Sequence, residues 1–435
     1  MGLFNFGKKK QETVKDFANA EVKKVKEKSH MLAIPKHPEQ LTDVMQIVER
    51  LKNAKDFTML QMGMREDRVP WHEIEYMGEK YEFVIYPEHY KIPELFRVQH
   101  FFEDVDVKEI DKQETGLVIA MDFSDKFLES YHLQLKIIHT IFPEVLAVID
   151  YDAEKILSGT WLAYAAEGKT PPAPRYLFTA QAVYDNNEVW LHTHGLNRCG
   201  LMELEIIGST KESSNNHYRV LESMASRLID EPDSLDDGGP IYLARFVNGQ
   251  PLMVTWVPWQ QAMGLVNKKS LGGPADRTDE CGHNGYTGCV YAYQSSADME
   301  NKRYSHISVY DELLENNPMF MFTNQETDRL RTLAIERVDY MKKAFLGGAK
   351  GVLIKVGLKI DEEHRTDTNE REHIWFELKS VQEDTFTAVL TQEPYMVSGM
   401  HEGDEGTYLY TDITDWIVFT EKNRISPDDI YLLDK

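Results

Sequence analysis

The pattern of hydrophobic and polar positions in residues 30–169 switches repeatedly between the periods of strands and helices. Short apolar runs predict buried or half-buried strands at residues 31–34, 57–64, 81–86, 116–123 and 144–151. Apolar positions spaced three and four apart predict amphipathic helices at residues 41–53, 124–142 and 156–165. Strands and helices mixed in this way favour an α+β layer with helices against one face of a sheet.

Residues 170–348 are richer in hairpin patterns. Two strands around an Asn-rich turn are predicted in residues 176–194, and the Asn-Gly pair at residues 248–249 lies between two apolar runs, which is a strong hairpin signal. The polar, glycine-rich residues 267–288 predict a long surface loop, and loops of that length are often functional or disordered. A helix predicted at residues 325–345 closes this block.

Residues 349–435 alternate like the strands of a small sheet. Strands are predicted at residues 351–360, 371–381, 385–397, 406–411 and 415–419. The fold class expected for the chain is α+β, with two mixed α/β layered domains followed by a small antiparallel-sheet C-terminal domain. The expected division is a leader at 1–29 and domains at 30–169, 170–348 and 349–435, with a Pro-rich connector near residue 170.

The leader at residues 1–29 is rich in lysine although the rest of the chain is acidic. Its apolar residues recur at helical spacing, so it predicts a basic amphipathic helix. Such a helix can lie on an anionic membrane surface, and residues 1–28 are therefore a candidate membrane contact. The alternative is a solvated leader that packs loosely on the protein.

Composition narrows the classes of partner. The chain has 435 residues, 42% hydrophobic residues and a formal net charge of -24. This charge argues against nucleic acid, since phosphate binding depends on clustered cations, and it suits a protein partner with a basic surface. No apolar run approaches the roughly 20 residues that span a bilayer. Three cysteines are too few for a disulfide framework, so a reduced, cytoplasmic protein is expected.

The candidate chemistry is concentrated in residues 189–206. If this stretch is a hairpin, alternation places His192 and His194 on one face of the first strand, and Glu203 and Glu205 on one face of the second. With the apolar sides in the core, all four polar side chains are expected on one outer, solvated face. Imidazole and carboxylate together suit Zn²⁺, Mn²⁺ or Fe²⁺, or acid/base work. The alternative is an ordinary polar sheet surface.

A second, weaker metal candidate is the Cys281-x-His283 pair together with Cys289. With Cys199 or His194 nearby in space, a four-ligand site is conceivable. The alternative is buried or unreactive thiols, because paired Cys-x-x-Cys knuckles are missing from the sequence. No cofactor is therefore predicted, and Zn²⁺ or another divalent metal is the alternative.

In the last block, strand alternation leaves His373 and Trp375 on the face opposite the core. Asp415 and Trp416, from another strand, are expected to join them, and an exposed Trp beside His and Asp predicts a recognition surface. The alternative is that a second layer covers Trp375 and Trp416 as core.

The same block carries a resemblance to a known family, over about eighty residues. The residues that carry the resemblance are Lys355, Arg371-Glu372-His373-x-Trp375, Glu393-Pro394, Gly403-Asp404 and Asp412-Ile-Thr-Asp415-Trp416-Ile417. This pattern resembles the bacterial domain of unknown function 2314, also called YegJ-like, and the preceding region is similar to the domain of unknown function 4026. The resemblance implies a bacterial cytoplasmic protein and supplies no activity.

An acidic chain with few catalytic motifs favours protein interaction without catalysis, in an immunity-type or adaptor role. The first alternative is a metal-dependent hydrolase centred on His192, His194 and Glu203 or Glu205. The second alternative is peripheral membrane attachment through the leader.

Overall fold

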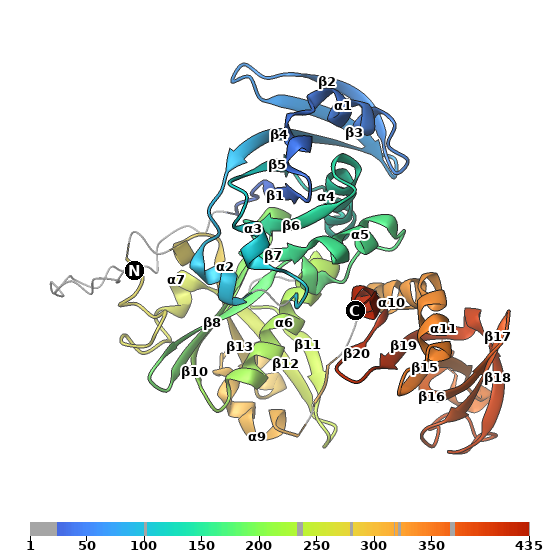
Figure 1. Cartoon of the computed structure of the whole chain (residues 1–435). Helices are drawn as coiled ribbons and strands as arrows, with labels where there is room; N and C mark the ends of the chain where they lie inside the picture. Colours follow the sequence, from blue (N-terminus) through green and yellow to red (C-terminus); the bar gives the residue numbers. More distant parts are fainter. Residues whose placement is uncertain are drawn as a thin grey trace. The chain divides into compact units, whose positions relative to one another are not determined.

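The computed structural model describes residues 24–99, 102–232, 238–278, 282–316, 318–320, 323–365 and 370–434. The chain divides into two compact units (Figure 1). Of the described residues, one unit contains those in 27–179 and 322–435, and the other contains those in 180–321 together with 24–26. Residues 1–23 of the leader, which is predicted as an amphipathic helix, lie outside the described residues. Among the described helices, none combines the length and the hydropathy needed to cross a membrane.

The first sheet is built from residues 29–158 and is antiparallel throughout. Its strand order is β2-β3-β4-β5-β1-β6-β7. The bounds are β1 (Ser29–Pro35), β2 (Thr58–Met64), β3 (Pro70–Tyr76), β4 (Glu79–His89), β5 (Thr115–Met121), β6 (Val145–Asp150) and β7 (Lys155–Ser158). The helices are α1 (Val44–Lys52), α2 (Glu94–Gln99), α3 (Val107–Ile110), α4 (Phe127–Ile141) and α5 (Gly159–Glu167). Strand β3 was not predicted, and the start of the helix predicted at 156–165 is strand.

The third sheet in chain order belongs to the same unit as the first. It is six-stranded and antiparallel, with the order β18-β17-β16-β15-β19-β20. The bounds are β15 (Gly351–Lys359), β16 (Arg371–Val381), β17 (Thr385–Leu390), β18 (Glu405–Leu409), β19 (Ile413–Phe419) and β20 (Arg424–Ile425). Helices α10 (Asn324–Glu336) and α11 (Val338–Leu346) supply Ala334 and Met341 to its core. The expected boundary at 348/349 therefore separates these helices from the sheet on which they pack.

Buried arginines of this C-terminal part also join it to residues 27–179 in the same unit. The guanidinium of Arg337, at the break between α10 and α11, donates to the carbonyls of Pro427 (2.7 Å) and Tyr164 (3.0 Å). Arg329 donates to the Pro171 carbonyl (3.2 Å) and pairs with Glu326 and Asp428 within the C-terminal part. The helix predicted as one element at 325–345 is interrupted at Arg337, whose backbone (φ -103°, ψ 15°) is not helical.

The second unit contains a mixed sheet with the order β14-β11-β12-β13-β10-β9-β8. The bounds are β8 (Thr179–Asp185), β9 (Glu188–His194), β10 (Glu203–Thr210), β11 (Ile241–Arg245), β12 (Pro251–Pro258), β13 (Thr287–Tyr293) and β14 (Met319–Phe320). Strands β10 and β13 pair in parallel. Helix α6 (Ser214–Asp230), which was not predicted, packs against β9 and β10. Three open sheets with helices confirm the α+β class.

Candidate metal centre

Strands β9 and β10 hold the histidines and glutamates that the sequence singles out. The two strands are antiparallel neighbours, and His192 lies opposite Glu205 in their register. Residues opposite each other in a β ladder point to the same side of the sheet. The prediction of a shared face is therefore confirmed for His192, His194 and Glu205.

This face is not solvated, and that part of the prediction is wrong. His192 is 3% exposed, Glu203 is 6% exposed and Glu205 is fully buried. The cover comes from described residues of the segment predicted as a surface loop at 267–288, namely 267–278 and 282–284. In that segment Arg277 is buried beside Trp190, and a Cβ added to Gly272 would lie 2.5 Å from the Trp190 ring.

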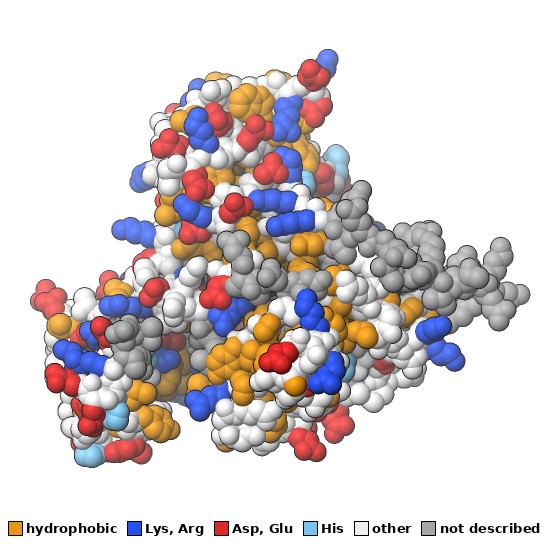
Figure 2. Space-filling model, turned by 180° about the vertical axis from the view of Figure 1, so that it is seen from behind, with side chains coloured by type: hydrophobic (Ala, Val, Ile, Leu, Met, Phe, Trp, Pro, Cys, Tyr) orange, Lys and Arg blue, Asp and Glu red, His pale blue; other side chains and the backbone are white. Residues whose placement is uncertain are grey.

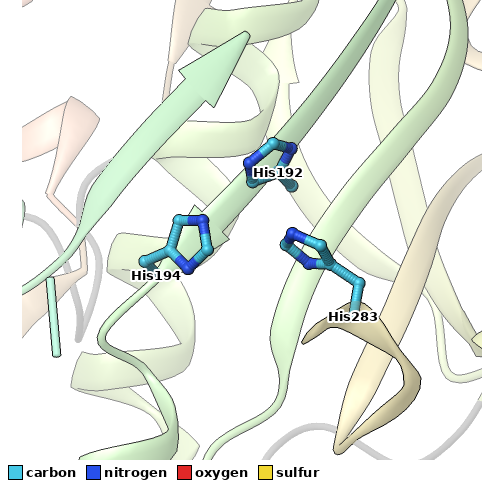
Figure 3. Close-up of side chains that lie close together, drawn as sticks. All are labelled: His192, His194 and His283. Carbon is cyan, nitrogen blue, oxygen red and sulfur yellow. The ribbon is translucent and has the colours of Figure 1, made fainter. Parts of the chain in front are cut away.

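The covering segment brings a third histidine to the pair on β9. His283 lies in the short turn η6 (Gly282–Asn284), and its ring centroid is 4.4 Å from that of His192 and 5.2 Å from that of His194. His192 and His194 are 5.0 Å apart, centroid to centroid. Each of the three imidazoles offers one nitrogen, and these atoms all lie within 4.8 Å of one another. Figure 3 shows the three rings converging on a common space.

The Nδ1 atom of His192 is buried and has no hydrogen-bond partner among the described residues. Leaving a buried polar atom unsatisfied costs about 1–3 kcal/mol, so such atoms need an explanation. The Nδ1 atoms of His72 and His132 share this property, yet neither belongs to a group of ligand-forming side chains. It is the combination of a buried, unused ring nitrogen with two further imidazoles that points to a cation.

Burial also determines the protonation of these rings. Desolvation is the main cause that holds the pKa of His192 well below its ordinary value, and His283 and His194 lower it further. The pKa of His283 is lowered to about 3, again mainly by desolvation. Both rings are therefore neutral near pH 7, and neutral imidazole is the form that binds metals.

The glutamates expected as ligands have other partners. Glu203 accepts hydrogen bonds from the backbone N–H groups of Gly195 (2.8 Å) and Asn197 (3.1 Å) and from the Thr193 hydroxyl (2.7 Å). It therefore holds the turn after β9. Glu205 accepts from the Trp190 indole (3.0 Å) and pairs with Arg277. Neither carboxylate belongs to the group of possible ligands, so the hypothesis of a ligating Glu203 or Glu205 is replaced by one with His283.

Three family models match parts of the chain. The model described as "Protein of unknown function (DUF4026) N-terminal" matches residues 29–172, and its C-terminal counterpart matches residues 180–291. "Uncharacterized protein conserved in bacteria (DUF2314)" matches residues 332–427. The chain therefore carries both DUF4026 domains followed by a DUF2314 domain. No curated protein and no solved structure matches it.

All three histidines lie in the DUF4026 C-terminal domain, and so do the cysteines. Cys199 is buried and does not belong to the group of possible ligands. Cys289 lies opposite Glu205 in the parallel β10–β13 pair, and burial raises the pKa of its thiol well above the ordinary value. Cys281 lies outside the described residues. Of the four-ligand combination considered from the sequence, His194 and His283 are the members that the structure brings together.

In the DUF2314 domain, Lys355 on β15 lies opposite both Trp375 on β16 and Asp415 on β19. His373 is exposed, and the other three side chains are half-buried on the face away from α10 and α11. Burial raises the pKa of Asp415 to about 6. Trp416 points the other way: it is fully buried and donates to the Ala334 carbonyl (3.0 Å). Trp416 is therefore a core residue and not part of an exposed binding face.

Proposed function

We propose that the DUF4026 C-terminal domain binds a divalent transition-metal ion, in the first place Zn²⁺, through His192, His194 and His283. The observation that carries the proposal is the convergence of three imidazoles whose ligand atoms lie within 4.8 Å of one another. Neutral imidazole is the commonest protein ligand for such ions, and Zn²⁺, Cu²⁺ and Ni²⁺ all accept it.

Binding requires a small contraction of the site. A tetrahedral ion with Zn–N bonds of about 2.0–2.1 Å holds two nitrogen ligands about 3.4 Å apart. The three nitrogens must therefore approach one another by up to about 1.4 Å. His194 and His283 are half-buried, and rotation about their side-chain bonds supplies this movement without a change in the strands.

Three protein ligands leave the fourth position of the ion for water or a substrate oxygen. This arrangement is typical of catalytic zinc, whereas structural zinc usually has four protein ligands. The chemistry that suits it is hydrolysis, in which the ion lowers the pKa of a bound water and polarises the bond that is attacked. The proposed site therefore keeps the hydrolase alternative raised from the sequence and changes one ligand.

The competing explanation is an aromatic cluster without a metal. Trp190 lies 4.6 Å from His192 and 4.7 Å from His283, measured between ring centroids, so the imidazoles already pack against an indole. Packing alone leaves the buried Nδ1 of His192 unsatisfied. A metal ion bound to that nitrogen removes the cost of leaving it unsatisfied.

Cobalt substitution tests the proposal directly. Co²⁺ added to chelator-treated, full-length protein is expected to give the visible absorption of a four-coordinate site, saturating at about one ion per chain. The variants H192A and H283A are expected to lose this signal. The matched control is H401A, which removes an exposed histidine that pairs with Glu393 on the surface. Absorption that is absent, or that is equal in wild type and H192A, contradicts the proposal.

A second candidate function is protein interaction through the open face of the DUF2314 sheet. The specific support is the row of Asp415, Lys355 and Trp375 across three neighbouring strands, with His373 exposed beside it. The net charge of -24 suits a basic partner. Acidic and basic side chains are nevertheless mixed over the face shown in Figure 2, so the charge does not gather into one acidic patch there.

The interaction candidate is tested by partner capture with a matched pair of variants. W375A removes the aromatic side chain from the open face, and K379A removes a more exposed charge further along the same strand. A partner retained by wild type and K379A and lost by W375A is the expected result. A partner retained by all three proteins places the interaction elsewhere.

A further inference from the structure

The carboxylate of Glu205 is only half used by hydrogen bonds. Its Oε2 atom accepts from the Trp190 indole N–H (3.0 Å) and from the Arg277 guanidinium. Its Oε1 atom is buried and has no hydrogen-bond partner among the described residues. This oxygen lies 3.8 Å from Nδ1 of His283, which is just beyond hydrogen-bond distance.

Arg277 fixes both sides of this gap. Its Nε–H donates to the Gly272 carbonyl (3.0 Å), and its Nη1 donates to the backbone carbonyl of His283 (2.7 Å). Its Nη2 donates to Glu205 at the same time. One buried guanidinium therefore holds the carboxylate on β10 and the backbone of the turn that carries His283 in fixed relation.

We infer that Glu205 is a positioning residue for the metal site, and this inference rests on the proposed function. Its Oε1 atom accepts a hydrogen bond from Nδ1–H of His283, so that Nε2 of the same ring is presented to the ion beside His192 and His194. Metal-bound histidines almost always donate their other ring N–H to a carboxylate, a carbonyl or water, which fixes the tautomer and the ring orientation. At 3.8 Å the carboxylate already favours a proton on Nδ1 in the metal-free protein, and the contraction that metal binding requires closes the contact.

Glu203 provides a matched contrast two residues away. Both of its oxygens already accept hydrogen bonds, Oε1 from the Gly195 and Asn197 N–H groups and Oε2 from the Thr193 hydroxyl. A carboxylate engaged in this way holds a turn and, among the described residues, has no oxygen without a hydrogen bond, unlike Oε1 of Glu205. The same chemical change at the two positions therefore separates positioning of the ligand from general effects on the strand.

The amide variant E205Q reverses the polarity of the contact. Trp190 and Arg277 both require an acceptor, so they take the amide oxygen of glutamine, and its NH₂ group then faces Nδ1 of His283. A donor at that place favours the tautomer with the proton on Nε2, which is the nitrogen needed by the metal. E205Q is therefore expected to weaken zinc binding while the fold is kept.

The experiment measures Zn²⁺ affinity by chelator competition in full-length wild type, E205Q and E203Q. We expect E205Q to bind about 10–100-fold more weakly and E203Q to stay within about threefold of wild type. ¹⁵N NMR of histidine-labelled, metal-free protein reports the tautomer of His283, assigned by its absence in H283A. The expected change is from Nδ1–H in wild type toward Nε2–H in E205Q, which a merely structural role would not produce.

The outcomes separate the inference from the proposed function. Zinc bound equally well by wild type and E205Q, or an unchanged His283 tautomer, overturns the role of Glu205 alone. A wild-type protein that binds no zinc overturns the proposed function, and the inference with it. If E205Q unfolds, E205D keeps the charge and withdraws the oxygen by one methylene. The expected loss of affinity is then smaller, and an unchanged affinity in E205D overturns the inference.

Discussion

Two histidine clusters lie in the unit formed by residues 180–321, and they differ in how their ring nitrogens are used. His192, His194 and His283 converge, and the buried Nδ1 of His192 has no partner among the described residues. His217 and His306 also lie close together, with ring centroids 5.8 Å apart, yet each of their four ring nitrogens has a hydrogen-bond partner. Proximity of imidazoles alone therefore does not indicate a metal site.

The second cluster is a structural hydrogen-bond network. Nδ1 of His217 lies 2.8 Å from the Ser209 hydroxyl, and its Nε2 lies 2.7 Å from Asp311. This is a Ser-His-Asp sequence of contacts, but Ser209 is 1% exposed and His217 is fully buried. A nucleophile must reach its substrate, so this arrangement joins α6 to its neighbours instead of carrying out catalysis. The comparison teaches that unused donor and acceptor capacity separates a candidate ligand from a buried structural histidine.

The largest expected effect is on metal affinity. Replacing His192 with alanine removes one of three ligands, so Zn²⁺ affinity is expected to fall by about 100-fold or more, which is roughly 2.7 kcal/mol. H217A is expected to change the affinity by less than about threefold, because neither ring nitrogen of His217 faces the proposed site. Isothermal titration at pH 7.5 measures both. An equal loss in the two variants removes the distinction between the clusters.

The next largest effect is on stability, and here the variant of the second cluster, H217F, is expected to lose more than H192F. H217F leaves the Ser209 hydroxyl and the Asp311 carboxylate without their partner and is expected to lower the free energy of unfolding by about 2–3 kcal/mol. H192F replaces a ring with an unsatisfied buried nitrogen by an apolar ring, so a change within about 1 kcal/mol is expected for metal-free protein. Urea denaturation compares the two variants. A greater loss in H192F contradicts the assignment.

Two glycines sharpen the comparison further, because each lies beside one cluster with a positive φ. A Cβ on Gly272 (φ +73°) meets the Trp190 ring at 2.5 Å, whereas a Cβ on Gly208 (φ +90°) has its nearest contact at 3.7 Å, with His306. G208A therefore carries only backbone strain, about 1 kcal/mol, and G272A adds a steric clash, for about 2 kcal/mol. G272A alone is expected to weaken zinc binding several-fold. Similar affinities in both variants would show that Trp190 does not support the site.

The smallest effect is the pH dependence of stability. Desolvation lowers the pKa of His217 and of His306 in the folded protein. Below about pH 6.5 the unfolded chain takes up protons that the folded protein does not, so stability falls as the pH falls, by at most about 1.4 kcal/mol per pH unit for each histidine. H217F is expected to show a shallower fall than wild type between pH 6.5 and 5. Parallel curves contradict a neutral, buried His217.

Much of the fold follows from hydrophobic periodicity in the sequence. Most strands of the first and third sheets lie where apolar runs predict them, because a sheet with one buried face imposes a two-residue period; the exceptions are β3, β7 and β20. Helix α6 was overlooked although Val220, Leu221, Met224 and Leu228 carry helical spacing on its buried side. The assignment of α10 and α11 to the third sheet depends on packing, which periodicity does not report.

The candidate site could be predicted only in part. Alternation along β9 and β10 correctly places His192, His194 and Glu205 on one face. It gives no information on what covers that face, so the burial of Glu205 and the role of Arg277 were missed. His283 lies 89 positions after His194, and the sequence pattern associates it only with Cys281 and Cys289. Its approach depends on the placement of residues 267–278 and 282–286, to which long-range contacts such as the Arg277–Glu205 pair contribute.

The central claim is tested most directly by diffraction at the zinc absorption edge, from crystals of the full chain grown with one equivalent of Zn²⁺. The account predicts an anomalous peak between the rings of His192, His194 and His283, about 2.0–2.1 Å from one nitrogen of each. A peak at other residues, or clear density for the three imidazoles with no peak between them, would contradict it.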